Sequence, residues 1–357
     1  MNRRFWIILG SIALAGSGPA LSQGPIPGGP PAKRYPWDQR QPKCFLPDAL
    51  PAGPCRANDW PDYGETKRHV DQLLMVGDPD LLDRAENELG YSDKRFPSGD
   101  YYFDAWFYSM DMMLKYQSQP LYKVVDGWGK AKGEGGYVKL AETLLRFGEG
   151  QQAGRGFSNT VTREATDIYW RKMREANQIL DSASDRLKHT GPWYVVKLRL
   201  VSQLPELKKS RDGLLAEAAK VWPEYTRLYI AAMEYSLPAY GGSYEEVEKI
   251  ARFAVESTKA KWGTSWYAIV YNQMARFVCQ CTLTDAKFDW DLMKQSFRDY
   301  EARGRGSESV FRAYANMACV VRDRKEARRL LEAADKMSSD RSPDPPDPCR
   351  EFAFSTT

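Results

Sequence analysis

Residues 70–90 read VDQLLMVGDPDLLDRAENELG, and this stretch decides the fold class. The apolar residues of 70–76 are spaced for one face of a helix, and Gly77 can supply the left-handed residue that ends it. Asp78 then fits the cap of a second helix that begins with Pro79, where a missing N–H costs nothing. The stretch therefore predicts a helical hairpin.

Helical periodicity continues along the chain to about residue 336. Further helices are predicted over 101–116, 138–145, 163–187, 214–221, 228–235, 247–255, 267–274, 290–300, 309–321 and 325–336. No stretch shows the alternation and β-branched enrichment of strands, so the fold class is all-α. Hairpins of roughly 30 to 45 residues are typical of a tetratricopeptide-like α-solenoid. Exact repetition is weak, so a compact helical domain is the structural alternative.

The prolines divide the chain into four regions. Ten of the 22 prolines lie between Gln23 and Gly64, which favours an extended Pro-rich arm. We assign 1–22 to a signal peptide, 23–64 to this arm, 65–340 to an all-α helical-repeat domain and 341–357 to a Pro-rich C-terminal tail without regular structure.

The first 22 residues have the parts of a secretory signal. Arg3 and Arg4 precede an apolar stretch that is far shorter than the roughly 20 residues of a membrane span. Ala20-Leu21-Ser22 fits the cleavage rule, so we expect cleavage between Ser22 and Gln23 and a periplasmic or secreted protein with no membrane span after cleavage. An uncleaved N-terminal anchor is the alternative.

The charge balance argues against binding to nucleic acid. The 357 residues carry 51 basic and 47 acidic side chains, a net charge of +4. Nucleic-acid binding needs clustered positive charge, which this balance does not provide. The 11 Trp and 20 Tyr supply either core or binding surface.

Six cysteines make disulfides an expectation in an oxidising compartment. These disulfide candidates are Cys44, Cys55, Cys279, Cys281, Cys319 and Cys349. Cys44 and Cys55 are the favoured local pair, and Cys319 fits equally well as a small buried side chain within a helix. Six cysteines allow about 15 connectivities, which the sequence does not resolve. The spacing of Cys279 and Cys281 is wrong for zinc, so we expect no metal site.

Several motifs between about residues 121 and 331 resemble one family. They are Trp222-Pro223-Glu224-Tyr225 continuing to Leu237-Pro238-Ala239-Tyr240-Gly241-Gly242-Ser243, Asp289-Trp290-Asp291-Leu292-Met293, Asn316-Met317-Ala318-Cys319, and Gly154-Arg155-Gly156 with Pro192-Trp193-Tyr194. The chain is similar here to the domain of unknown function 4034 family, an uncharacterised bacterial family. The resemblance implies tetratricopeptide-like helices and no particular activity.

Catalytic signals are weak. The chain has two histidines, His69 and His189, each near a predicted helix end, and it lacks a G-x-S-x-G elbow. A position at a helix C-terminus, where its charge meets the helix dipole, is the favoured reading of His189. The glycines of 127–136 do not match a phosphate loop and predict a flexible interhelical loop. We expect no cofactor.

Six residues are the candidates for binding: Arg155, Tyr240, Trp262, Trp266, Arg303 and Arg305. Arg303 and Arg305 could bind a phosphate or an acidic partner, although a short turn between helices explains them as well. The leading hypothesis is an exported, non-enzymatic interaction or scaffold protein whose helical-repeat groove binds a peptide or protein partner. The rival, prompted by the aromatic residues of 262–267, is a carbohydrate-active enzyme or glycan-binding protein on an α-helical toroid.

Overall fold

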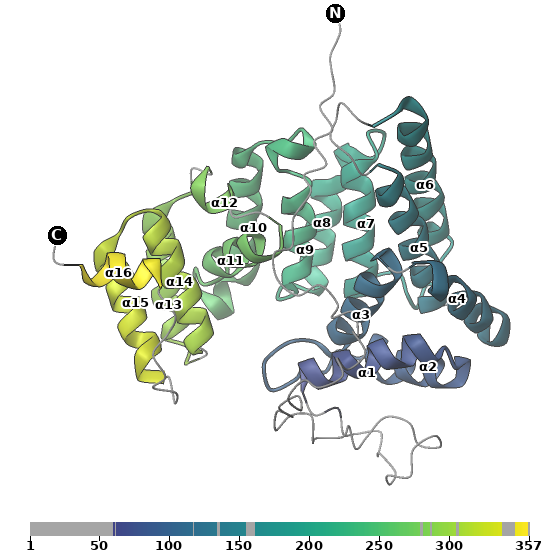
Figure 1. Cartoon of the computed structure of the whole chain (residues 1–357), viewed down its shortest axis with the longest axis horizontal. Coiled ribbons are helices and arrows are strands. Elements are labelled where there is room, and N and C mark those ends of the chain that lie inside the picture. Colours follow the sequence, from purple (N-terminus) through teal and green to yellow (C-terminus); the bar gives the residue numbers. More distant parts are fainter. Residues whose placement is uncertain are drawn as a thin grey trace, which may run out of the picture. The chain divides into compact units, whose positions relative to one another are not determined.

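A computed structural model describes residues 60, 62–116, 118–133, 136–154, 161–278, 281–285, 288–304, 307–337 and 347–355. The all-α prediction is confirmed, because these residues form helices and turns (Figure 1). An isolated bridge between Arg95 and Tyr101 is the sole β-type pairing among them. No helix in these ranges has both the length and the apolar character needed to cross a bilayer.

The region predicted as one helical domain divides into two compact units, and the division falls within a helix, between Gly148 and Glu149. The N-terminal unit contains α1 (Tyr63–Val76), α2 (Pro79–Ala85), the π-helix η2 (Glu86–Gly90), α3 (Tyr102–Tyr116), α4 (Ser118–Lys132) and most of α5 (Tyr137–Ala153). The C-terminal unit begins with the last residues of α5 and holds the remaining helices.

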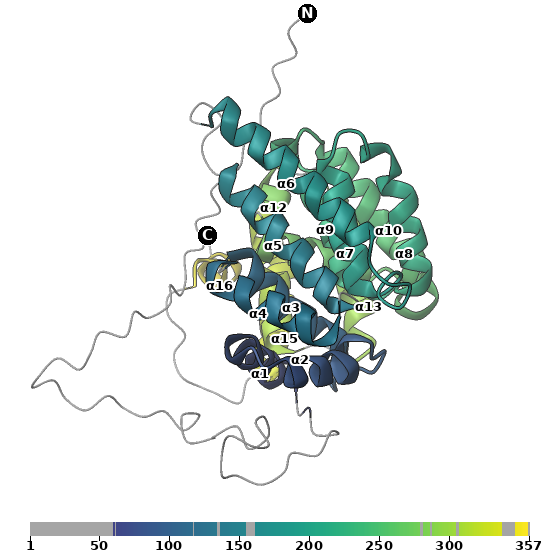
Figure 2. The same ribbon diagram turned by 90° about the vertical axis from the view of Figure 1, so that its right-hand side faces the viewer.

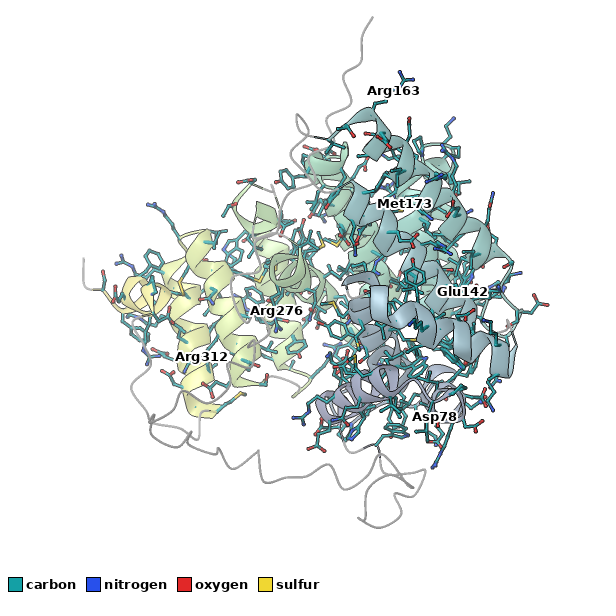
Figure 3. The ribbon with its side chains drawn as sticks, turned by 45° about the vertical axis from the view of Figure 1, so that its right-hand side comes forward. Asp78, Glu142, Arg163, Met173, Arg276 and Arg312 are labelled. Carbon is teal, nitrogen blue, oxygen red and sulfur yellow. A yellow bond between two sulfur atoms is a disulfide. The ribbon has the colours of Figure 1, made fainter. Side chains whose placement is uncertain are left out.

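Local signals in the sequence set the first hairpin as predicted. Gly77 ends α1 in the left-handed conformation at φ 70°, and its N–H bonds to the Leu73 carbonyl. The Asp78 side chain accepts from the backbone N–H of Asp80 and of Leu81, and Pro79 is the first residue of α2. Figure 3 shows Asp78 at this junction. Capping and left-handed termination therefore account for both helix ends.

The predicted loop over the glycines at 127–136 was wrong in its first part. Gly127 and Gly129 lie inside α4, which continues to Lys132. The buried side chains Leu121, Val125 and Trp128 are spaced for one helix face, and their burial outweighs the low helix propensity of glycine.

Aromatic side chains form the core of the N-terminal unit. Trp106 and Trp128 are fully buried and meet edge to face with centroids 6.1 Å apart. The buried Tyr137 hydroxyl donates to the Gly90 carbonyl at 2.5 Å, which fixes the end of η2. At the same time α5 approaches α3 closely, because a Cβ on Gly148 would lie 2.7 Å from the Lys115 carbonyl oxygen.

Helices of the C-terminal unit form successive hairpins. Their bounds are α6 (Arg163–Asp181), α7 (Gly191–Gln203), η3 (Lys208–Ser210), α8 (Arg211–Val221), α9 (Thr226–Glu234), η4 (Pro238–Tyr240), α10 (Tyr244–Trp262), α11 (Trp266–Phe277), α12 (Cys281–Thr284), α13 (Trp290–Glu301), α14 (Glu308–Val320), α15 (Arg324–Met337) and α16 (Pro348–Phe354).

The hairpins stack in chain order. Helix α7 packs on α6, α8 and α9, and α9 packs in turn on α10 and α11. Figures 1 and 2 both show α7, α8 and α9 side by side. Farther along, α11 contacts α13 and α14, and α14 contacts α15. We call α6, α8, α10, α13 and α15 the A helices and α7, α9, α11 and α14 the B helices.

In this unit the end of α6 was misplaced from sequence, and α7, α12 and α16 were not predicted. The predicted helix over 163–187 ends at Asp181, and the next helix, α7, was not predicted. Pro348 was expected to end regular structure in the C-terminal tail, but it is the first residue of α16, which the Asp347 side chain caps. A proline at the first helical position is pre-organised for a helix, so the last proline of a cluster can begin one.

His69 lies in the middle of α1, not near a helix end. Its imidazole is 4% exposed, and Nδ1 lies 2.9 Å from the Glu65 carbonyl oxygen. Burial lowers the pKa of His69 from 6.5 to about 4, against the raising effect of that backbone contact. The folded N-terminal unit therefore holds a neutral histidine that the unfolded chain would protonate.

We predict that two glycine substitutions in helix interiors have opposite effects. Gly148→Ala should lower the free energy of unfolding by about 1–3 kcal/mol, because the new methyl group meets the Lys115 backbone. Gly127→Ala is the matched control, since a Cβ there has no atom within 4 Å. It should raise stability by about 0.5–1 kcal/mol through helix propensity. Urea unfolding measures both, and equal effects would contradict the close approach of α5 to α3.

We also predict a pH dependence from His69. Because its folded-state pKa is lowered, the unfolded state binds more protons between pH 6.5 and about 4, and stability falls as pH decreases through this window. The loss is on the order of 3 kcal/mol. His69→Gln should remove that part of the pH dependence in urea unfolding, whereas His189→Asn should keep it. Identical pH profiles for wild type and His69→Gln would refute the assignment.

Candidate interaction scaffold and its inter-helix ties

Polar contacts join consecutive hairpins along one edge of the C-terminal unit. This turning edge comprises residues at the ends of α8, α10 and α13 and in the turn after α6, with Arg329 from the middle of α15: His189, residues 221–224, residues 261–264, residues 301–303 and Arg329. The Trp222 indole N–H donates to the His189 carbonyl at 2.8 Å, and Lys261 Nζ lies 2.7 Å from Glu224 Oε1. At the end of the edge Arg329 Nη1 contacts both carboxylate oxygens of Glu301, at 2.7 and 2.8 Å.

Arg303 provides the link in the middle of the turning edge. Its Nε donates to the Lys261 carbonyl at 2.8 Å, and Nη1 donates to the Asp299 carbonyl at the same distance. Asp299 Oδ2 accepts from the backbone N–H of Thr264 at 2.6 Å and from its hydroxyl at 2.8 Å. Gly263 ends α10 at φ 57°, and a Cβ on it would lie 2.4 Å from Asp299 Oδ2. The α10–α11 turn is thus clamped by the end of α13.

The opposite edge, where the A helices begin, carries a second series of ties. We call it the starting edge; its residues are 211–212, 246–252, 289–290 and Asp323. Lys249 Nζ lies 3.4 Å from Asp212 Oδ2, and Arg252 Nη2 lies 3.0 Å from Asp289 Oδ2. The Trp290 indole donates to Asp323 Oδ2 at 2.9 Å. Each consecutive pair of A helices from α8 to α15 is therefore joined by contacts of both series.

Arg211 adds a buried cation to the starting edge. Its Nη1 donates to the Ser236 hydroxyl at 2.6 Å and lies 3.4 Å from Glu246 Oε2, while Nε bonds to Asp212. A buried guanidinium needs both a counter-charge and acceptors, and here Asp212 of α8, Ser236 after α9 and Glu246 of α10 supply them.

Glu248 lies at the centre of a polar node that joins three helices of the unit. Its Oε2 accepts from the hydroxyls of Tyr267 at 2.5 Å and Tyr271 at 2.7 Å, and its Oε1 lies 2.7 Å from Arg252 Nε. Tyr267 Oη also accepts from the backbone N–H of Asp289 at 2.8 Å. Burial, and then the bond to Glu248, raises the pKa of Tyr267 far above its usual value. The phenols therefore stay neutral donors, and the node holds α10, α11 and α13 together.

Asp289 shows the electrostatic character of these ties. The N–H of Leu292 and then the Arg252 guanidinium lower the pKa of its carboxyl below the usual range. The carboxylate caps α13 and forms an ion pair with α10 at the same time. Asp291, next but one along the chain, instead pairs with Lys294 in the first turn of α13. The two carboxylates thus stabilise the start of α13, Asp289 as its cap and Asp291 as a first-turn charge.

His189 was expected at a helix C-terminus, and this was wrong. It directly precedes Thr190, the cap of α7, and has a left-handed backbone with φ 70°. Its Nδ1 lies 2.9 Å from Tyr194 Oη, which donates to Glu217 Oε1 at 2.6 Å. Since the phenol proton is directed to Glu217, Nδ1 of His189 carries a proton and donates to Tyr194. These contacts fix the α6–α7 turn against α8.

The structure places the predicted binding aromatics in or near the core. Trp262 and Trp266 flank the clamped α10–α11 turn and are 6% and 3% exposed. The Trp266 ring packs edge to face on Tyr229, with centroids 5.5 Å apart. Packing therefore explains the aromatic segment that prompted the carbohydrate hypothesis. Tyr240 is half-buried in η4 and packs edge to face on Tyr235.

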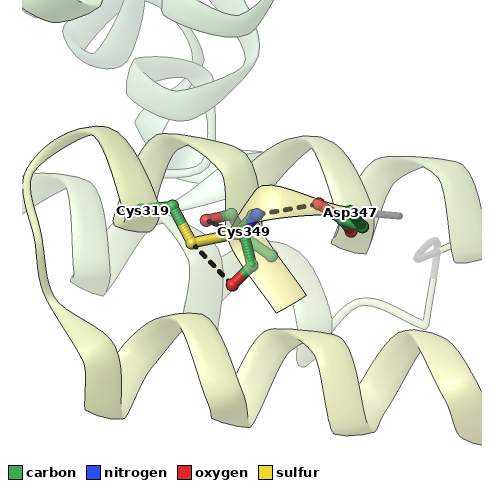
Figure 4. The surroundings of a disulfide bond; sticks show 4 residues. Cys319, Asp347 and Cys349 are labelled. Atoms are coloured by element: carbon green, nitrogen blue, oxygen red, sulfur yellow. Dashed lines mark hydrogen bonds between the residues drawn. A yellow bond between two sulfur atoms is a disulfide. The ribbon is translucent and has the colours of Figure 1, made fainter. Parts of the chain in front are cut away.

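Only some of the arginines predicted to bind a partner and of the cysteines predicted to form disulfides lie among the described residues. Arg303 is exposed and engaged with two backbone carbonyls, whereas Arg155 and Arg305 lie outside the described residues. Cys44, Cys55 and Cys279 also lie outside them, as does the side chain of Cys281. Cys319 and Cys349 form a disulfide with Cα atoms 5.6 Å apart, within the usual range (Figure 4).

Sequence reasoning missed Glu248, Tyr267 and Tyr271 as a node. Glu248 and Arg252 lie four residues apart on α10, and the tyrosines lie four apart on α11, so each pair shares a helix face. That spacing was the available signal. Their meeting depends on the hairpin contact, which no local pattern encodes.

Comparisons with known protein families, with curated proteins and with solved structures find no match. The similarity to the domain of unknown function 4034 family stays a prediction. The ties described above are therefore the basis for inferring function.

We predict that Arg303→Ala destabilises the C-terminal unit by about 1 kcal/mol, because two hydrogen bonds to backbone carbonyls are lost. Arg298→Ala is the matched control, at an exposed position in the last turn of α13, the helix that Arg303 follows. It should leave the urea midpoint unchanged. If both substitutions had the same effect, Arg303 would not clamp the α10–α11 turn.

Proposed function

We propose that this protein is a non-enzymatic scaffold whose stacked hairpins present a surface to a peptide or protein partner. The observation that supports this most is the series of ties along both edges of the C-terminal unit. Trp222, Lys261 and Arg303 each join one hairpin to the next. Stacked repeats fixed in this way form an extended surface whose shape is set before binding.

The use of the reactive side chains supports the same proposal. In the node around Glu248, the carboxylate accepts from two neutral phenols and pairs with Arg252. Near His189, the Tyr194 hydroxyl lies between the His189 imidazole and the Glu217 carboxylate. In both clusters, the carboxylate, phenol and imidazole groups that could transfer protons instead join neighbouring helices. Helix packing is therefore sufficient to explain why these groups lie together.

The turning edge is the part of the scaffold that we assign to partner contact. Val221 is 52% exposed there, next to the half-buried ring of Trp222. The side chains of His189 and Lys261 are 64% and 62% exposed. Aromatic rings are enriched at protein interfaces, and exposed polar side chains around such a ring are typical of an interface rim.

We also propose that the protein acts outside the cytoplasm, as the signal-like first 22 residues predict. The Cys319–Cys349 disulfide supports this, because such bonds persist in oxidising compartments. The protein would then meet its partner in the periplasm or in the medium.

The test is site-specific photo-crosslinking in an envelope extract. A photoreactive residue at Val221 should give a discrete adduct with a partner, whereas one at Met75, which is 61% exposed in the N-terminal unit, should not. Trp222→Phe keeps an aromatic ring but removes the indole N–H that donates to the His189 carbonyl, so it should reduce the Val221 adduct severalfold. No adduct at Val221, or equal adducts at both positions, would contradict the proposal.

A further inference from the structure

Helix α16 occupies a defined place on the last hairpin of the C-terminal unit. It packs on both α14 and α15, and it turns Ala353, which is fully buried, and Cys349 toward them. The Cβ of Ala353 thus enters a space that suits a small side chain. The segment 347–355 is short, and three kinds of contact hold it: arginines of α15, an arginine–aspartate pair and a disulfide.

Two arginines of α15 hold the end of this segment. Arg328 Nε donates to the Ala353 carbonyl at 3.1 Å, and its guanidinium lies 5.1 Å from the Phe354 ring centroid. Arg324 Nη1 contacts the Ser355 carbonyl at 3.5 Å and lies 5.2 Å from the Phe352 ring. Each guanidinium therefore contacts a main-chain oxygen and an aromatic ring together.

A carboxylate of α15 holds the start of the segment. Asp335 accepts two hydrogen bonds from Arg350, with Nη1 to Oδ1 at 3.0 Å and Nη2 to Oδ2 at 2.6 Å. This fork-to-fork geometry is specific for arginine. Phe354 is nevertheless 38% exposed, so its ring lies at the margin of the contact.

One covalent bond joins the segment to the hairpin. The disulfide runs from Cys319, near the end of α14, to Cys349 in the first turn of α16 (Figure 4). A dithiol reductant cleaves such a bond by exchange: one thiolate attacks a sulfur, the second closes the reductant's own disulfide, and two cysteine thiols result. Only non-covalent contacts would then hold α16 on the hairpin.

From these contacts we infer that the α14–α15 face is a peptide-binding site and that residues 347–355 are its tethered ligand. The inference rests on the proposed scaffold function and deepens it. The partner is a peptide with an arginine and, two to four residues later, two aromatic residues that flank a small residue. Disulfide cleavage by a dithiol releases α16 and opens the site to that partner.

The test uses the full chain and a fluorescent peptide of residues 347–355 carrying Cys349→Ser. In fluorescence polarisation, the oxidised chain should not bind the peptide, because its own α16 is locked in place. The full-length Cys349→Ser, Ala353→Glu variant lacks the disulfide and strains the α16 contact, so it should bind. Adding Arg328→Ala to that variant should weaken binding at least tenfold, while Lys325→Ala, an exposed neighbour, should not.

Hydrogen exchange on the same samples shows whether α16 has left the hairpin and whether the rest of the unit stays folded. Exchange in α16 should increase in the variant and in wild type treated with a dithiol, while α7, α9 and α11 stay protected. If α16 stayed protected in both, the disulfide would not be a latch and the inference would fail. If α16 were released and the peptide still did not bind, the face would not be a peptide site. Neither result depends on partner capture at the turning edge, so the scaffold proposal is tested separately.

Discussion

Each amphipathic helix of this chain can bury its apolar stripe only against another hairpin, and the rest of the C-terminal unit follows from this constraint. Helix α15 is an example: Ala327, Leu330 and Leu331 are buried, while most of its other side chains are polar. On α13 the Phe297 ring stacks on Tyr314 of α14 at 4.5 Å. Burial of a leucine or phenylalanine side chain against a neighbouring hairpin contributes about 1.5–3 kcal/mol. A single hairpin lacks this contribution and is unstable alone.

Stacking brings the ends of consecutive A helices close together, and polar residues there become ties. Exposed ion pairs contribute little individually. Their value at the two edges lies in geometry, because contacts such as Arg303 to the Lys261 carbonyl and Trp222 to the His189 carbonyl fix the register of adjacent turns. The same arrangement leaves aliphatic and cationic side chains exposed on the turning edge.

The sequence predicted those parts of the fold that depend on local chemistry. The α1–α2 junction follows from residues within one turn, namely Gly77, Asp78 and Pro79. It failed where tertiary packing outweighed local preference. Helix α4 continues through Gly127 because Trp128 is buried, and α16 begins at Pro348 because Asp347 caps it and the disulfide holds it.

The candidate site was less predictable, for a physical reason. Trp262 and Trp266 are apolar enough for either a core or a binding surface, and only the stacked hairpins decide that they are buried. The ties join residues far apart in the chain, as in Trp222 with His189, 33 positions apart, and Arg303 with Lys261, 42 positions apart. Such pairs meet only through the register of whole hairpins, which periodicity does not specify.

The hairpins of the C-terminal unit form one coupled stack, and native-state hydrogen exchange measured against denaturant concentration can check this coupling. We expect the exchange free energies of α7, α9 and α11 to converge on a common unfolding transition as denaturant increases. Separate transitions for the individual hairpins, with no convergence, would contradict it.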